Sequence, residues 1–157
     1  MSLKFVTVST FVLALSLSGE AFAAGSSTNA LFNGQVADTC ILAATNAGTL
    51  TSSADYKQLS SINAGGAQST LMATSTSSNY KISTIAPSSF TNGDSTNVNF
   101  SSNYALSGAT SQSSVPGTNA TPLAQGNTQV AVDLSAQKAS GTFPAGNYAA
   151  AVTVRCE

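Results

Sequence analysis

The chain has 157 residues, of which 42% are hydrophobic and only 7% are charged, and its formal net charge is −1. Soluble proteins carry about 25% charged residues, so hydroxyl and amide side chains must solvate most of this surface. With five basic residues against six acidic ones, nucleic acids and anionic lipids are excluded as expected partners. Disorder requires low hydrophobicity and high net charge, so we expect a folded domain.

The first 23 residues have the pattern of a secretory signal peptide. Lys4 supplies the positive charge, and the apolar run Phe5–Ser18 that follows is shorter than the roughly 20 residues of a membrane-spanning helix. We therefore expect cleavage between Ala23 and Ala24 and export to the periplasm, cell surface or medium. The mature chain is expected to be one domain, 24–157, without a membrane span. An uncleaved membrane anchor is the alternative.

Strand patterns then recur along the mature chain, separated by Gly, Pro, Asn and Ser. The first strand is expected over 30–37, with Phe32 and Val36 on one face. One short helical turn is expected over 54–62, and a long loop over 107–126. Further strands are expected over 40–43, 68–74, 80–85 and 98–106.

The clearest alternation lies near the C-terminus. Val130, Val132 and Leu134 alternate with polar residues, and Tyr148–Cys156 alternates over nine residues. The turn-forming stretch 138–147 between them predicts a hairpin-like pair. Several short strands joined by such turns predict an all-β, antiparallel sandwich or barrel.

The chain has two cysteines, Cys40 and Cys156. In an exported protein two cysteines usually pair, and both residues lie on the inward faces of their expected strands. We therefore expect one disulfide that joins the last strand to a strand near the mature N-terminus. A loop of about 100 residues closed in this way is worth about 4.7 kcal/mol in the chain-entropy model. Free thiols and a bond between two molecules are the alternatives.

Catalytic patterns are scarce. The sequence has no histidine, so histidine-based triads and zinc sites cannot form. The carboxylates are widely spaced, and Gly65-Gly66 lacks the spacing of a phosphate loop. A serine–lysine pair that uses Lys57, Lys81 or Lys138 stays open. We expect no enzyme activity and no cofactor, and a small secreted hydrolase is the weakest alternative.

Two other site types were weighed. The stretch Asn92–Asn97 has oxygen-bearing side chains at alternate positions, as calcium loops do, but it has one carboxylate and is interpreted as a turn. Asn99 and Asn119 match the glycosylation pattern, which arises by chance in such a sequence. The four tyrosines, Tyr56, Tyr80, Tyr104 and Tyr148, could form a sugar-stacking surface.

The signal pattern, the run Phe32–Cys40 (FNGQVADTC) and the closing Pro144–Val154 (PAGNYAAAVTV) resemble bacterial fimbrial subunits, most closely the spore-coat-U-like pilins of the archaic chaperone–usher class. The resemblance covers the two ends of the chain. It implies an immunoglobulin-like sandwich, export to the periplasm, and assembly into surface fibres by donor-strand exchange with the help of a periplasmic chaperone.

The chain departs from these pilins in two respects. Their disulfide usually lies nearer the N-terminal part, and their last strand tends to end with an aromatic residue, whereas this chain ends in Val154-Arg155-Cys156-Glu157. A bond from Cys156 to Cys40 would lock the last strand, so we expect it to complete the sandwich without a partner strand.

Two functions follow as hypotheses. The first is a structural or adhesive fimbria-like subunit, in which a sheet edge or the N-terminal segment 24–30 pairs with other copies by strand addition. The second is a monomeric secreted or periplasmic binding module, for example for glycans, with a surface lined by Tyr, Asn and Asp.

Overall fold

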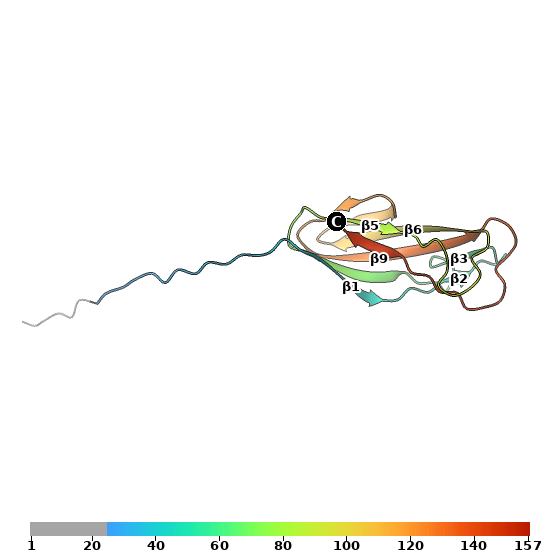
Figure 1. Ribbon diagram of the computed structural model, residues 1–157, viewed down its shortest axis with the longest axis horizontal. Coiled ribbons are helices and arrows are strands. Elements are labelled where there is room, and N and C mark those ends of the chain that lie inside the picture. The colour runs from blue at the N-terminus through green and yellow to red at the C-terminus, as the bar shows by residue number, and fades with distance from the viewer. Residues whose placement is uncertain (1–24) are drawn as a thin grey trace, which may run out of the picture. The chain divides into compact units, whose positions relative to one another are not determined.

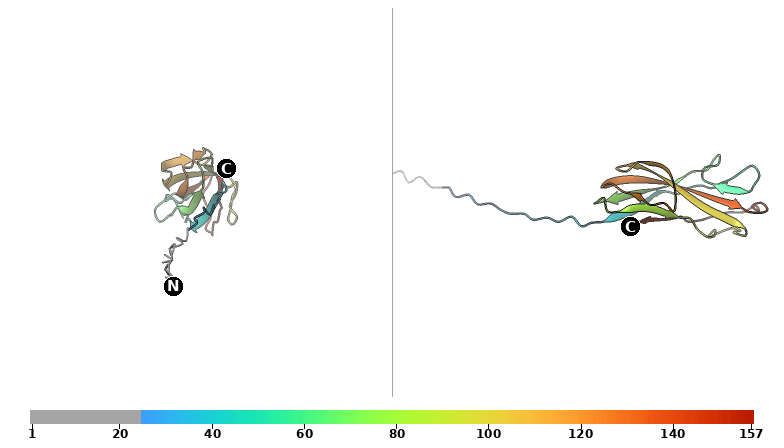
Figure 2. Two further views of the ribbon diagram at one scale, coloured as in Figure 1. Left: turned by 90° about the vertical axis from the view of Figure 1, so that its left-hand side faces the viewer. Right: turned by 90° about the horizontal axis from the view of Figure 1, so that it is seen from above.

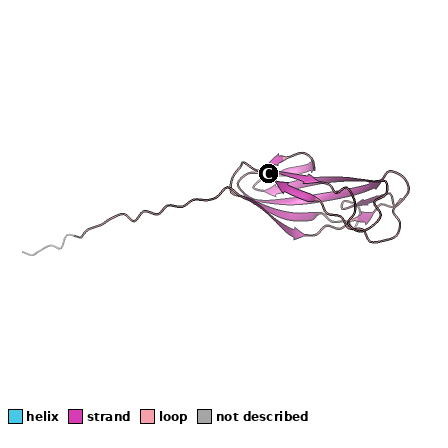
Figure 3. Ribbon diagram, in the orientation of Figure 1, coloured by secondary structure: helices cyan, strands magenta, loops and turns pink. Residues whose placement is uncertain are grey.

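The computed structural model describes residues 25–157, and within that range the chain forms strands, turns and loops but no helix (Figure 3). The predicted all-β class is confirmed. The expected cleavage site at Ala23 and Ala24 lies outside the described residues. The strands are β1 (Cys40–Asn46), β2 (Thr51–Ser52), β3 (Gln58–Ser60), β4 (Ser69–Ser75), β5 (Lys81–Ile85), β6 (Val98–Gly108), β7 (Gln112–Pro116), β8 (Thr121–Pro122), β9 (Gly126–Lys138) and β10 (Thr153–Cys156).

The larger sheet is built around the long strand β9 and is antiparallel throughout. One edge of β9 pairs with β4 along Gly126–Val132 and with β3 along Ser135–Gln137. The other edge pairs with β6, which in turn pairs with β7. Strand β1 pairs with β4 and β2 with β3, so β1 and β2 are outer strands. The expected alternation of Val130, Val132 and Leu134 is confirmed, because all three are buried.

The smaller sheet has the order β10-β5-β8 and is also antiparallel. It lies over the larger sheet in the views of Figures 1 and 2. The two sheets share one apolar core, to which Ile82 contributes from the smaller sheet and Val130 and Leu106 from the larger. The domain is therefore sandwich-like, whereas the immunoglobulin-like strand order stays a prediction.

Tyr104 fixes the two sheets to each other. Its ring is fully buried on β6, and its hydroxyl lies 3.1 Å from the carbonyl oxygen of Ile82 on β5 and 2.7 Å from that of Asn119. The hydroxyl groups of Thr84 and Ser102 make a second buried link, 3.0 Å long, between β5 and β6. Buried polar groups that find partners in this way specify one packing arrangement.

An aromatic cluster forms a second core. Phe90 makes edge-to-face contacts with Phe100, Phe143 and Tyr148, with ring centroids 4.8 to 6.0 Å apart. Such pairs contribute about 0.5–1.5 kcal/mol beyond the area they bury. Lys138 lies beside this cluster, 5.3 Å from the centre of the Phe143 ring, so the cluster also covers a charged side chain.

Several local predictions need correction. The expected hairpin between Val130–Leu134 and Tyr148–Cys156 is wrong, because β9 and β10 lie in different sheets. The last strand is shorter than expected and begins at Thr153. The helical turn over 54–62 is absent, and β3 lies there instead. The expected loop 107–126 contains β7 and β8.

The N-terminal segment differs most from expectation. Residues Gln35–Glu157 form one compact unit, which contains both sheets. Residues 30–37 do not form the expected strand, and every side chain from 25 to 38 is exposed. Phe32 and Val36 are 93% and 81% exposed, so neither belongs to the core. Residues 25–36 are called the arm below. No helix among residues 25–157 is long and apolar enough to cross a membrane.

Candidate functional site

The disulfide joins two strands, β1 and β10, that each have an edge without a partner strand. In the described part of the chain β1 pairs only with β4, and β10 pairs only with β5. Cys40 begins β1 and Cys156 ends β10, and the two are bonded with their Cα atoms 6.3 Å apart. The predicted disulfide is confirmed as intramolecular, and both cysteines pack against the main core. From this bond the two edges run side by side in opposite chain directions.

The C-terminal rim, residues 148–156, keeps the predicted alternation although only part of it is a strand. Side chains at even positions from Tyr148 to Cys156 are half-buried, and those at odd positions are exposed. One end is anchored by Ala149, which exchanges backbone hydrogen bonds of 3.0 and 3.4 Å with Asn92. The other end is anchored by the pairing of β10 with β5. Between the anchors, Ala150–Val152 lie outside any strand.

The opposite rim consists of β1 and the segment 47–50. Thr49 and Ala67 exchange backbone hydrogen bonds of 2.8 and 3.0 Å, which bring this segment against the start of β4. Gly48 allows the close approach, since a Cβ atom there would lie 2.9 Å from the carbonyl oxygen of Ala67 and 2.9 Å from the amide nitrogen of Ser69. A larger residue at this position would push the rim away from β4.

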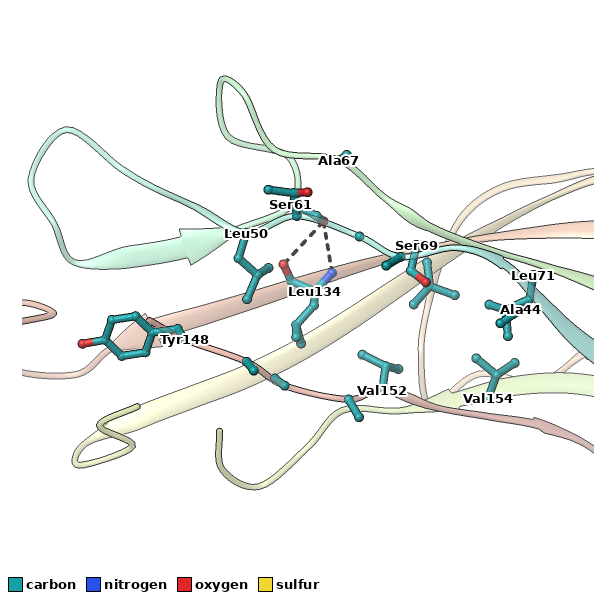
Figure 4. Close-up of a pocket in the computed structure, with 17 residues that line it drawn as sticks. Ala44, Leu50, Ser61, Ala67, Ser69, Leu71, Leu134, Tyr148, Val152 and Val154 are labelled. Atoms are coloured by element: carbon teal, nitrogen blue, oxygen red, sulfur yellow. Dashed lines mark hydrogen bonds between the residues drawn. The ribbon is translucent and has the colours of Figure 1, made fainter. Parts of the chain in front are cut away.

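Between the rims lies an apolar groove of about 460 Å³. Figure 4 shows Leu50 and Leu71 on one side of it and Val152 and Val154 on the other, with Tyr148 at the opposite end from Val154. The lining residues are Ala44, Ala47, Gly48, Thr49, Leu50, Ser61, Ala67, Ser69, Leu71, Val132, Leu134, Tyr148, Ala149, Ala150, Ala151, Val152 and Val154.

The groove is open because its lining residues are small, particularly Ala149–Ala151 on the C-terminal rim. Apolar surface of this kind gains about 25 cal/mol per Å² when a partner covers it. The unpaired backbone of an edge strand offers hydrogen bonds to an added strand. The disulfide was expected to lock the last strand and complete the sandwich; the bond is present, and the groove stays open beside it.

The polar groups of the groove floor have structural partners. The Ser61 amide donates to the carbonyl oxygen of Leu134 over 3.1 Å, and the Leu134 amide donates to the Ser61 hydroxyl oxygen over 3.2 Å (Figure 4). The same hydroxyl donates to Asp133 over 2.7 Å. These bonds extend the pairing of β3 with β9 and keep the floor rigid.

Tyr148 is held firmly at its end of the groove. Its hydroxyl donates to the carbonyl oxygen of Pro144 over 2.8 Å, and its ring packs edge-to-face on Phe90 and Phe143. Gly93, whose φ angle is +109°, lies against the same ring, and a Cβ atom there would overlap it. The aromatic cluster therefore fixes the position of Tyr148.

A second hollow of about 720 Å³ lies next to the groove and shares Leu50 and Tyr148 with it. Tyr56, which is 60% exposed, lines it together with Ser52, Thr142 and Asn147. The structure therefore places two of the four tyrosines in one hollow. It does not bring the other two there, since Tyr104 is buried and Tyr80 packs against the main core.

The stretch 92–97, whose sequence has part of the calcium-loop pattern, uses its single carboxylate in other contacts. Asp94 accepts a 2.6 Å ion-paired hydrogen bond from Lys138 Nζ and a 2.9 Å bond from the Thr96 amide. The hydrogen bond from Lys138, followed by those from Thr96, lowers the pKa of Asp94 to about 2. This arrangement supports the interpretation of the stretch as a turn. It also takes Lys138 out of consideration as a base for a serine.

Sequence reasoning did not find the groove. Its residues come from β1, β4, β9, the segment 47–50, the turns after β3 and before β4, and the C-terminal rim, and no local pattern says which strand edges stay unpaired. The only local signal is the run of small residues Ala149–Ala151 inside an otherwise alternating segment. Comparison of the chain with protein-family models, with curated proteins and with solved structures gives no match.

Proposed function

We propose that this chain is an exported, non-enzymatic structural or adhesive protein of the cell surface, a fimbria-like subunit that joins other copies by strand addition. In this proposal the groove receives the arm of another copy. The arm adds a strand between β1 and the C-terminal rim, and its apolar side chains fill the groove. The same mode of binding, in which an extended peptide completes a sheet, recurs among peptide-recognition domains.

The observation that carries the proposal is the position of the groove. It lies between the unpaired edges of two sheets, where an added strand gains backbone hydrogen bonds and apolar contacts together. Exposed edges and apolar surface favour aggregation unless they have a partner.

The arm matches the groove in length and pattern. Ala30, Phe32, Gly34 and Val36 share one face of an extended chain, and Phe32 and Val36 supply bulk opposite a rim made of alanines. Residues 30–36 and the rim residues 148–154 each span about 20 Å when extended. The arm is therefore longer than the expected segment 24–30, because the exposed residues continue to 38.

A subunit with an open apolar groove needs cover before assembly. A periplasmic chaperone that lends a strand to the groove would supply it, in agreement with the resemblance to chaperone–usher pilins. The disulfide does not oppose this role, since it leaves the groove open between Tyr148 and Val154.

The experiment compares the mature protein with a variant that lacks residues 25–36, each expressed in the native host. Unreduced envelope fractions are run on gels with and without boiling. The proposal expects a ladder of multimers that collapses on boiling for the intact protein, and monomers alone for the variant. The same ladder from the variant would overturn the proposal.

A monomeric glycan-binding module is the second candidate, and the second hollow favours it. Aromatic rings beside hydroxyl and amide groups are typical of sites for polar ligands with apolar faces. The Tyr56→Ala variant should then lose signal on a glycan array, whereas Tyr80→Phe should keep it. An array without hits for the intact protein would overturn this alternative.

A further inference from the structure

We propose that the groove is closed to the chain's own arm and accepts only the arm of another copy, which enters from the end near Leu50 and Tyr148. This inference rests on the proposed function, because it takes an arm as the occupant. Two independent features carry it. The disulfide closes one end of the groove, and residues 37–39, which connect the arm to β1, are held in an extended conformation.

Without such features the chain would be expected to fill its own groove. The arm leads directly into β1, and a hairpin with a loop of 2–5 residues would lay residues 30–36 along the unpaired edge of β1. A short linker gives an effective concentration in the ~mM range, which other copies at lower concentration cannot match. A subunit that joins others through its arm therefore needs a barrier to self-insertion.

The disulfide is the first barrier. Neighbouring strands lie about 4.8 Å apart, so two rims with a strand between them must be about 9.6 Å apart. At the disulfide the Cα atoms of Cys40 and Cys156 are only 6.3 Å apart. A hairpin that turned at 37–39 would have to place its returning strand at this level, where there is no room. A longer loop that turned past the disulfide would have to use arm residues, so that first Val36 and then Phe32 would lie in the loop and not in the groove.

The second barrier is a set of hydrogen bonds that continues the β1–β4 pairing by one residue. The Thr76 amide donates to the carbonyl oxygen of Thr39 over 3.0 Å, and the Thr39 amide donates to the Thr76 hydroxyl oxygen over 2.7 Å. The Thr76 hydroxyl also lies 2.9 Å from the carbonyl oxygen of Ala37. Residues 37–39, which precede Cys40, therefore stay extended, and the chain does not turn there toward the unpaired edge of β1.

Asp38 strengthens this barrier. One of its carboxylate oxygens accepts a 2.6 Å hydrogen bond from the Ser77 hydroxyl, and the other accepts a 3.0 Å bond from the side-chain amide of Asn79. These two bonds lower the pKa of Asp38, so the carboxylate is ionised and bound at neutral pH. A turn at 37–39 would break all of these bonds.

The consequence is a groove with one closed end and one open end. An arm from another copy meets neither barrier if it approaches from the end that Leu50 and Tyr148 line. It can fill the groove as far as Val154 and must stop before the disulfide. Cys40, Cys156 and Asp38 therefore select a partner copy over the chain itself.

The test uses a fluorescent peptide of residues 25–38 as the probe. It is titrated into the mature protein, 24–157, and into a variant that lacks residues 25–36, both too dilute to self-associate, and fluorescence anisotropy is measured. If the arm is excluded from its own groove, the two proteins should bind the peptide equally within about twofold. A Cys40→Ala/Cys156→Ala/Asp38→Ala/Thr76→Ala variant, which removes the disulfide and the side-chain bonds of the second barrier, should bind about tenfold more weakly than its own arm-deleted counterpart, because its arm now competes. Asp55→Ala is the matched control. Like Asp38, Asp55 accepts hydrogen bonds from nearby groups, here the Ser53 hydroxyl and the Lys57 backbone amide.

The outcomes separate the two proposals. Tighter peptide binding after arm deletion from the otherwise intact protein would show that the arm occupies its own groove, and it would overturn the inference while the proposed function stands. Equal binding by the quadruple variant and its arm-deleted counterpart would also overturn it. No peptide binding by any of the proteins would overturn the proposed function. The comparison of intact and arm-deleted protein needs no core substitution, so it decides even if the quadruple variant does not fold.

Discussion

Cys40 and Cys156 join the unpaired edges of two different sheets, with their Cα atoms 6.3 Å apart at a sequence separation of 116. The bond therefore does two things. It ties the ends of the folded domain together, and it sets the spacing of the groove rims at one end.

Loss of this bond should destabilise the domain strongly. The Cys40→Ala/Cys156→Ala variant should lose about 2–5 kcal/mol of the free energy of unfolding, as small exported domains do when a native disulfide is removed. Urea unfolding of the oxidised wild type, the reduced wild type and the variant measures the difference. Equal urea midpoints for all three would contradict this role.

Phe32 should matter for assembly and not for the stability of the monomer. Because its side chain is 93% exposed, Phe32→Asp should leave the melting temperature of the monomer unchanged. Removal of an apolar side chain that an acceptor groove buries costs about 1.5–3 kcal/mol, so association should weaken by about 10- to 100-fold. Sedimentation velocity measures the fractions of monomer and multimer for wild type and variant. Ser27→Asp, which adds the same charge elsewhere on the arm, is the control and should assemble normally.

A filled groove should produce a subunit that can donate its arm but cannot accept one. Ala44 lines the groove and is itself exposed, so Ala44→Phe should fold normally and obstruct the site. Mixed with wild type, the variant should shorten the multimers by capping them. Ala43→Phe is the matched control, because Ala43 precedes it on β1 and does not line the groove. Multimers of unchanged length with Ala44→Phe would show that the groove is not the acceptor.

The fold class, the disulfide and the inward faces of two strands could be predicted from the sequence because they depend on local alternation and on residue type. The alternation at Val130–Leu134 and at Tyr148–Cys156 corresponds to burial in the structure. The partners of these strands could not be predicted. After β9, Phe143 and Tyr148 pack into the aromatic cluster with Phe90. The chain that follows pairs with β5 of the smaller sheet, not with β9.

The arm could not be told from a core strand for a related reason. An added strand and a core strand share the same alternation, so Phe32 and Val36 gave the signal of an inward face. Strands β7 and β8 were missed because their Ser- and Pro-containing sequences have low strand propensity, and only pairing with β6 and β5 makes them strands. The groove depends on which edges stay unpaired, and that is a property of the whole topology.

Acid should destabilise the fold partly through Asp94. The pKa of Asp94 in the folded protein is about 2, below the ordinary 3.8, so its contribution is complete above about pH 4 and is lost as the pH falls toward 2. Protonation of Asp94 also removes the charge partner of Lys138, whose side chain is 5% exposed. The Asp94→Asn variant should be less stable than wild type at neutral pH and should lose less stability between about pH 5 and pH 2. Equal losses in urea midpoint over this range would contradict the assignment.

The most direct test of the central claim is to map where the arm binds. A photo-crosslinking benzophenone side chain placed at position 32 is activated in multimers made from a mixture of isotopically heavy and light subunits, and mass spectrometry identifies the joined peptides. We predict crosslinks between heavy and light copies, from the arm of one to residues 47–50 or 148–154 of the other. Crosslinks confined to single copies, or to surfaces away from the groove, would contradict the account.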